Sequence, residues 1–320
     1  MSDTIDLRSY YNGRPKFSWA EEMAEFEYVQ PRYLIKPFIP SATWGILYGH
    51  PDVGKTQLAL SMALGILNGG YFLGRFKCRK GRVGLIEVDT EGPIMTERLK
   101  FVRTRHDWDE GTFGIAHYDA PIDIVQMHKH SKNDPEVFDW LKPMLDHKFD
   151  FIIIDSLNKV HSLEEDSNAT PKTVYRIFRE IIGSGPTIMF IHHSRKDSQN
   201  PAINPEKDEH DARGSGALKG DSNFMAKIYR TRSDPEIRAL SWIKAKGVAD
   251  KLKKPMNITL NPDTLLFQPS DPAFARAFPL VELGVSKKEV VEILGKENLA
   301  QSTKAYKVYD ECIEVMRESE

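Results

Sequence analysis

An eight-residue segment carries a residue pattern that binds phosphate groups. It reads Gly49-His50-Pro51-Asp52-Val53-Gly54-Lys55-Thr56 and fits G-x-x-x-x-G-K-[ST] at every fixed position. In this pattern the loop N–H groups and a helix N-terminus surround a polyphosphate, the lysine reaches the β- and γ-phosphates, and the hydroxyl binds Mg²⁺. We therefore expect this loop, with Gln57 after it, to bind ATP or a related nucleotide, and Thr56 to bind Mg²⁺.

A second segment could place a carboxylate beside that loop. Phe151-Ile152-Ile153-Ile154-Asp155 is an apolar run that ends in an acid, which predicts a strand with Asp155 at its end. In phosphate-loop enzymes a carboxylate at this place holds the Mg²⁺ next to the loop hydroxyl. Asp155 is followed by Ser156 and not by a second acid, so the residue that activates water must come from elsewhere.

An acidic segment between residues 83 and 92 could supply the water-activating residue. Glu87, Asp89 and Glu91 compete for this role. Because they are spaced by two, an extended strand would place all of them on one side, and periodicity alone does not choose. Ligands bind outside the carboxyl ends of strands in open α/β sheets, which favours Glu91 as the residue that orients water toward the γ-phosphate.

Alternating strand and helix patterns predict how these residues are brought together. Expected strands cover residues 33–40, 44–48, 82–89, 114–118, 150–155 and 187–191, and expected helices cover 57–67, 92–105, 135–145 and 171–182. This order predicts an α/β fold with a mostly parallel sheet that has helices on both faces. Later strands at 226–230, 238–244, 256–260 and 264–267 have no helices between them, which predicts an antiparallel extension of the sheet.

The sequence ends in a helical segment. Ser286 and Glu289 form a capping-box pattern, and Gly295 is expected to end the helix that follows. The next part resembles a helix-turn-helix. Residues 281–320 nevertheless hold six basic and nine acidic side chains, which favours a packing or oligomerisation role. We expect three regions: an N-terminal extension over 1–32, a phosphate-loop domain over 33–272 and a small helical appendage over 273–320.

Composition limits the classes of partner. The 320 residues carry a net charge of −2, so any DNA binding would depend on local basic patches. No apolar run approaches the length of a membrane span, and the two cysteines lack metal-ligand spacing. With the polar N-terminal residues, these features predict a cytoplasmic protein that does not bind membranes.

The order of several motifs resembles a known family. The segment 86–92 is similar to the part of RecA-type recombinases that carries their catalytic glutamate. The segments 191–196, 211–218 and 243–246 resemble successive motifs of RepA-type plasmid replication helicases and DnaB-type ring helicases. The resemblance spans roughly residues 30–270 and implies a RecA-like fold.

The resemblance also implies roles for individual residues. By position, His193 would sense the γ-phosphate, and Arg213 would act as a finger on the nucleotide of a neighbouring subunit. Lys244 and Lys246 would reach across the same boundary. The family further implies ATP as the nucleotide, DNA-dependent hydrolysis and a hexameric ring with composite active sites. It also implies single-stranded DNA as a partner and a helicase role in phage or plasmid DNA replication.

Two other functions stay open at this point. A RecA-like strand-binding recombination ATPase would form filaments without unwinding DNA. A nucleotide-switched DNA-binding regulator would read duplex DNA with the C-terminal helices.

Structural roles for the same residues stay open as well. His192 and His193 could be structural, or they could form a loose metal site with His210 and Asp211. Arg213 could pair with Asp211, and the two lysines could simply be solvated.

Overall fold

The computed structural model describes residues 32–118, 120–131, 134–141, 146–163, 170–183, 185–194, 219–231, 234 and 236–319. Residues 33–320 belong to one compact unit, which contains every element named below. The extension expected over 1–32 lies outside the described residues, except for Arg32. No helix in the described ranges is long and apolar enough to cross a bilayer.

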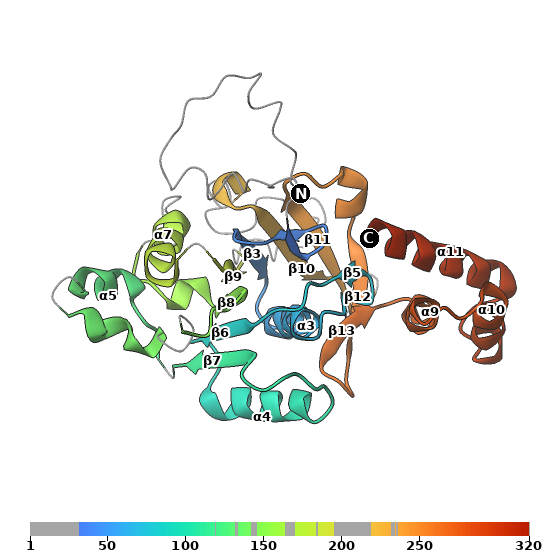
Figure 1. The fold of residues 1–320 in the computed structure, drawn as a ribbon, viewed down its shortest axis with the longest axis horizontal. Coiled ribbons are helices and arrows are strands. Elements are labelled where there is room, and N and C mark those ends of the chain that lie inside the picture. The colour runs from blue at the N-terminus through green and yellow to red at the C-terminus, as the bar shows by residue number, and fades with distance from the viewer. Residues whose placement is uncertain are drawn as a thin grey trace, which may run out of the picture. The chain divides into compact units, whose positions relative to one another are not determined.

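A sheet of nine strands forms the centre of the described part of the chain (Figure 1). The order across it is β13 (Leu266–Pro269), β12 (Met256–Asn261), β11 (Ile237–Ala245), β10 (Phe224–Arg230), β3 (Trp44–Gly49), β9 (Thr187–His193), β8 (Phe151–Asp155), β6 (Val83–Glu87) and β7 (Phe113–His117). The strands from β10 to β7 run parallel. β11, β12 and β13 extend the sheet in antiparallel pairs. The mostly parallel, RecA-like sheet with an antiparallel extension is therefore confirmed.

Helices cover both faces of this sheet. They are α3 (Lys55–Asn68), α4 (Gly92–Arg103), α5 (Ile124–His130) and α7 (Thr170–Ile182), with 3₁₀ turns η1 (Pro135–Leu141), η2 (Leu157–Lys159) and η4 (Asp250–Lys253). Successive strand residues point to opposite faces, so Leu47 and Ile153 join the hydrophobic cluster of α3 and α4. Ile46 and Ile154 join the cluster of α5 and α7 on the other face. Burial on both faces explains why β8 is apolar at every position before Asp155.

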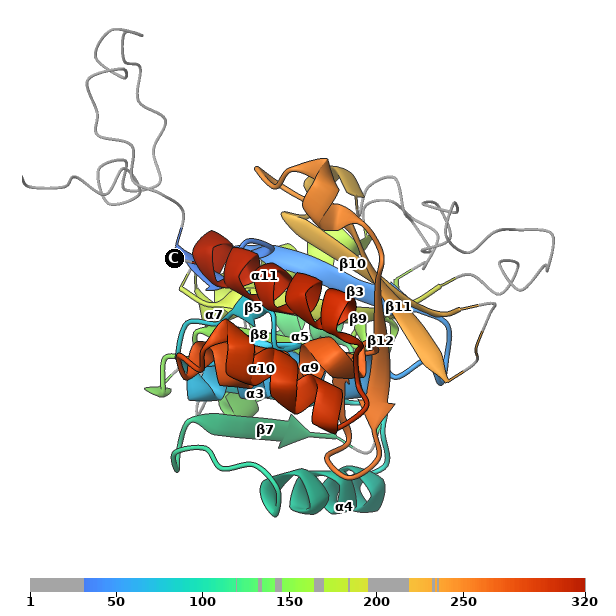
Figure 2. The ribbon, with the colours of Figure 1, turned by 90° about the vertical axis from the view of Figure 1, so that its right-hand side faces the viewer.

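The C-terminal helices form a hydrophobic core of their own. They are α9 (Pro272–Glu282), α10 (Lys287–Lys296) and α11 (Ser302–Ser319), which lie together in Figure 2. Ser286 and Glu289 make the predicted capping box at the start of α10. Two hairpins, β1 (Tyr33–Ile35) with β2 (Ile39–Pro40) and β4 (Tyr71–Phe72) with β5 (Phe76–Lys77), complete the elements.

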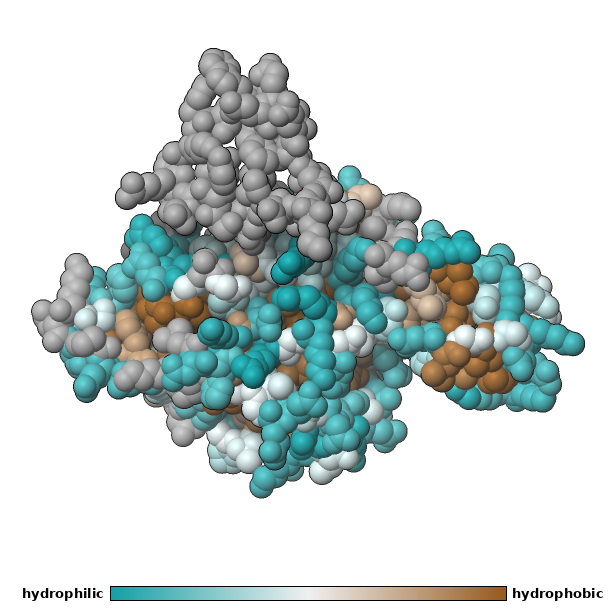
Figure 3. Space-filling view, viewed as in Figure 1, coloured by the Kyte–Doolittle hydropathy of each residue, from teal (hydrophilic) through white to brown (hydrophobic). Residues whose placement is uncertain are grey.

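These helices also contact the main sheet region. α9 contacts β13, and α11 contacts β5. Arg75 forms an ion pair with Glu311 of α11 at 2.7 Å. Figure 3 shows apolar side chains at the surface of this helical region, on the right of the view.

The direction of one strand differs from the expectation. The strand predicted at 226–230 was placed in the antiparallel extension, but β10 runs parallel to β3. Parallel neighbours need a crossover connection of about a dozen residues or more. The long segment between β9 and β10 provides that length. The prediction did not take into account that it allows a parallel strand.

Several helix boundaries also differ. The polar stretch before residue 131 contains α5, which Asp123 caps by accepting hydrogen bonds from the N–H groups of Val125 and Gln126. Of the helix expected over 135–145, the described part, residues 135–141, is the 3₁₀ turn η1, and residues 142–145 lie outside the described residues. Gly295 lies inside α10 and does not end it. α7 begins at Thr170, one residue before the expected range of 171–182.

Gly45 of β3 has no room for a side chain. A Cβ at this position would lie 2.4 Å from both the backbone oxygen and the ring of Phe224 in β10. We expect Gly45→Ala to lower the free energy of unfolding by about 2–3 kcal/mol, because the two strands would have to move apart. Urea unfolding followed by circular dichroism measures this. Gly70→Ala, whose Cβ would meet nothing within 4 Å, is the control; equal losses in both variants would contradict the prediction.

Candidate active site

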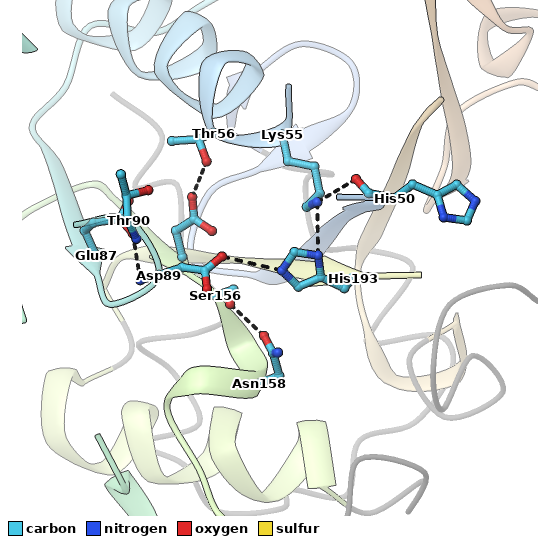
Figure 4. Close-up of polar contacts among 10 residues, drawn as sticks. His50, Lys55, Thr56, Glu87, Asp89, Thr90, Ser156, Asn158 and His193 are labelled. Carbon is cyan, nitrogen blue, oxygen red and sulfur yellow. Dashed lines mark hydrogen bonds and ion pairs between the residues drawn. The ribbon is translucent and has the colours of Figure 1, made fainter. Parts of the chain in front are cut away.

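Four parallel strands end together at the carboxyl edge of the sheet. The phosphate loop joins β3 to α3, and β6, β8 and β9 end beside it. Gly49 is paired in register with His193, and Asp155 is paired with Glu87. Figure 4 shows side chains from these segments directed into a common space. Residues that were predicted from separate segments are therefore brought to one place.

The phosphate loop has the backbone shape that its sequence requires. Asp52 and Gly54 have φ values of 57° and 95°, in the left-handed region that glycine adopts easily. Val53 is buried, whereas Pro51 and Asp52 are exposed. Gly54 is the N-cap of α3, and no side chain caps this end of the helix. The first N–H groups of α3, which includes Gln57, can therefore bind an anion.

Lys55 is held between the loop and the end of β9. Its Nζ donates to the carbonyl oxygen of His50 at 2.9 Å and lies 3.3 Å from Nδ1 of His193. The other ring nitrogen, Nε2, lies 3.5 Å from Oδ2 of Asp89. Burial lowers the pKa of Lys55, while Asp155 and Asp89 oppose this effect. The hydrogen bond from His193 is the main cause that lowers the pKa of Asp89.

Thr56 and Asp155 form the second contact of the site. The Thr56 hydroxyl donates to Oδ2 of Asp155 at 2.6 Å, and Asp155 is buried. Burial raises the pKa of Asp155 to about 6, against the hydrogen bond from Thr56, which lowers it. A hydroxyl and a carboxylate oxygen at this separation are the hard oxygen ligands that Mg²⁺ prefers. These residues fit a bound Mg²⁺, as predicted.

Glu87 is a buried acid next to Asp155. Its Oε1 accepts hydrogen bonds from the N–H groups of Asp89 at 2.9 Å and Thr90 at 2.8 Å. Its Oε2 is buried and has no hydrogen-bond partner among the described residues. Burial, and then the charge of Asp155, raises the pKa of Glu87 to about 8. Both effects favour the protonated form of Glu87.

The three acids after β6 take different positions. β6 ends at Glu87, so the strand alternation that was expected to align Glu87, Asp89 and Glu91 does not continue. Asp89 contacts His193, whereas Glu91 is exposed at the N-cap of α4. Within the described chain, none of the side-chain contacts that join the site involves Glu91. The contacts favour Asp89 as the acid that can orient water, and Glu91 stays a prediction from sequence.

The phosphate loop is also held from its outer side, by residues that the sequence analysis missed. Arg230 donates to the carbonyl oxygen of Asp52 at 3.1 Å, and Arg238 donates to that of Val53 at 3.3 Å. A Cβ at Gly54 would lie 2.8 Å from the ring of Phe267 in β13. No local pattern identifies these residues, because the arginines lie 178 and 185 positions after their partners.

The remaining predicted residues lie away from this space. Lys244 is paired in β11 with Met225, which is itself paired with Ile46, near the start of β3. Its Nζ donates to the carbonyl oxygens of Lys219 and of Gly220, the latter at 2.8 Å. Lys246 follows at the same edge of the sheet, opposite the phosphate loop.

Other predictions concern residues that the structure does not describe. Arg213, His210 and Asp211 lie outside the described residues. No group of three or more His, Cys, Asp or Glu side chains in the described ranges could hold a metal ion. His192 is buried in β9.

The buried Glu87 predicts how stability changes with pH. In the unfolded chain this carboxyl titrates near 4.5, and in the folded protein near 8. Between these values the unfolded state has lost a proton that the folded state keeps, so the free energy of unfolding falls as the pH rises. Glu87→Gln keeps both hydrogen bonds from N–H groups but does not titrate. We expect its free energy of unfolding, relative to that of the wild type, to rise by on the order of 2 kcal/mol between pH 5 and pH 8. Urea unfolding in EDTA measures this, with the exposed Glu91→Gln as control; parallel pH profiles for Glu87→Gln and the wild type would refute the prediction.

The two arginines behind the loop predict a change in nucleotide affinity. Each arginine donates to the carbonyl of a peptide unit in the loop. Because that unit is planar, the arginine also fixes the direction of its N–H group, which points to the opposite side. We expect Arg230→Ala and Arg238→Ala each to raise the Kd for ATP about fivefold, the effect of losing roughly one hydrogen bond. Equilibrium binding of a fluorescent ATP analogue measures this. Arg176→Ala, which removes an exposed arginine of α7, is the matched control. Loss of stability with unchanged affinity would show that the arginines do not position the loop.

Comparison with known proteins agrees with this geometry. A family model described as an AAA domain matches residues 12–199, more than half of the chain. This range includes the phosphate loop, Asp155 and His193, whereas β10 to β13 and the C-terminal helices lie beyond it. A search of curated proteins gives no match. The chain belongs to the AAA domain family and is a nucleotide-hydrolysing P-loop ATPase.

Proposed function

We propose that this ATPase hydrolyses ATP in a DNA-dependent manner, and that it works as a ring of identical subunits in the manner of RepA-type helicases. The observation that carries the hydrolytic part is the pair of contacts at the carboxyl edge. Thr56 lies 2.6 Å from Asp155, and Lys55 lies 3.3 Å from His193. They bring a metal site and a phosphate-binding cation together beside one loop.

Each residue in this space has a definite task in the proposal. When bound, Mg²⁺ neutralises charge on the phosphates, and the oxygens of Thr56 and Asp155 hold it. Lys55 balances the charge that develops between the β- and γ-phosphates. His193 contacts both Lys55 and Asp89. A phosphate that binds Lys55 would therefore change the contacts of His193, and through them those of Asp89.

Asp89 is the residue that we propose to orient the attacking water. Its carboxylate is ionised, because the hydrogen bond from His193 lowers its pKa. Its side chain is 30% exposed, so water can reach it. The Glu91 carboxylate is the alternative from sequence, and substitution of each acid separates the two.

The ring part of the proposal rests on the position of Lys244 and Lys246. They lie at the edge of the sheet opposite the phosphate loop of their own chain. They can contact a nucleotide only when a neighbouring subunit places its own phosphate loop at that edge. Arg213, outside the described residues, is the finger that we propose for the same boundary.

The DNA part of the proposal rests on the order of the motifs, which resembles that of RepA-type helicases. The net charge of −2 supplies no general attraction to DNA. A DNA contact would therefore be local and sensitive to salt. This makes DNA stimulation the decisive property to measure.

Steady-state ATP hydrolysis with and without single-stranded DNA tests the proposal. We expect stimulation by DNA of about tenfold or more, and loss of at least about 100-fold in Lys55→Ala, because the charge of the phosphates is then unbalanced. Asp89→Asn should lose about 100-fold in kcat, whereas Glu91→Gln should lose less than about threefold.

Other outcomes reassign the function. The reverse order of losses would return the water-orienting role to Glu91. Hydrolysis that is indifferent to DNA would exclude the DNA-dependent motor and favour a regulatory ATPase. Full hydrolytic activity of a protein that analytical ultracentrifugation shows to be a monomer would exclude a composite site.

A further inference from the structure

A cavity of about 630 Å³ lies away from the phosphate loop, between the sheet and the C-terminal helices. Its walls come from the turn after β1, from β5, from the antiparallel strands β11 to β13, and from α9 and α11. In Figure 2, α11 passes in front of β5 beside β12. The volume is within the range of about 300–1,000 Å³ that is usual for small-molecule sites.

Part of the cavity lining is apolar. Its lining includes the aromatic side chains of Phe76, Trp242 and Phe274, together with Met256 and Val315. Trp242 stacks on Phe38 with ring centroids 4.2 Å apart and an interplanar angle of 3°. The indole is therefore fixed by packing, and it forms a rigid wall for a flat molecule.

The charged side chains of the cavity lining that are not in ion pairs are positive. Both acids of the lining are engaged: Glu311 with Arg75 at 2.7 Å, and Asp271 with Lys304 at 3.1 Å. Lys36 and Lys254 also line the cavity. In the part of the chain that the structure describes, no acid lies within ion-pair distance of either lysine. They can bind an anionic group at no cost to an existing ion pair.

We propose that this cavity binds a small organic anion with a flat apolar body, such as an aromatic phosphate. Its ring would lie among Trp242, Phe76 and Phe274. Its anionic group would lie toward Lys36 and Lys254. The site goes beyond the ATPase function and does not depend on it, because none of its lining residues belongs to the phosphate loop. Because α9 and α11 form part of the wall, an occupant would also tie these helices to the sheet.

Calorimetric titration of the full-length protein with 1-naphthyl phosphate tests the proposal. Saturating Mg²⁺ and ADP occupy the phosphate loop throughout, so that the probe reports the second site alone. We expect one site per chain with a Kd below about 100 μM. Inorganic phosphate, which lacks the apolar body, should bind at least tenfold more weakly, about 1.4 kcal/mol.

Variants locate the binding. Lys254→Ala changes an exposed side chain and should weaken binding about fivefold. Phe76→Leu removes an aromatic ring from the lining and should also weaken binding about fivefold. Lys288→Ala, an exposed lysine of α10 outside the cavity, should leave binding unchanged.

Three results would overturn the proposal. The first is absence of heat up to 1 mM probe, a limit chosen at about tenfold the expected Kd. The second is equal binding by the wild type and Lys254→Ala, which keeps the decision independent of any folding defect in Phe76→Leu. The third is binding that appears only in a parallel titration without ADP, which would place the probe at the phosphate loop.

Discussion

Desolvation is the constraint that orders the nucleotide site. Lys55, Asp155 and Glu87 are withdrawn from water at one edge of the sheet, where an isolated charge would be costly. Each is compensated locally: the His50 carbonyl accepts from Lys55, Thr56 donates to Asp155, and Glu87 keeps its proton. A polyphosphate with Mg²⁺ supplies the opposite charges that Lys55 and Asp155 lack. Binding energy is then gained from groups that are already in place.

The loop that carries these charges depends on strands that come much later in the sequence. Arg230 and Arg238 hold two of its carbonyls, and Phe267 packs against Gly54. These residues lie in or near β10 to β13, beyond the part of the chain that the family model matches. β13 leads almost directly into α9. A displacement of the C-terminal helices therefore has a contiguous packed route to the loop, through Phe267.

The sequence predicted the parts of the site that are local. The phosphate loop predicted the places of Lys55 and Thr56, and the apolar run predicted that Asp155 would lie beside them, because parallel strands bring their ends to one edge. Alternation failed for the acids after β6, because the chain leaves the strand at Glu87 and the next residues follow turn geometry. Such a change of direction depends on the neighbouring strands, which a period-two pattern does not report.

Long-range contacts could not be predicted from the sequence, for a different reason. Arg238 has no motif around it, and its role follows only from the pairing of β10 with both β3 and β11. Trp242 could equally have been an ordinary core residue. Its place beside Lys36 and Lys254 exists only once α9 and α11 complete the wall of the cavity. Side chains whose partners are set by tertiary packing carry no local signal.

The edge opposite the phosphate loop is organised around Lys244. Burial lowers the pKa of this lysine, and the nearby Lys246 adds to the effect. Its ammonium is held by the carbonyls of Lys219 and Gly220, where the described chain resumes. Lys244 and Lys246 therefore concentrate positive charge at this edge, and a phosphate brought to it would relieve the repulsion between them.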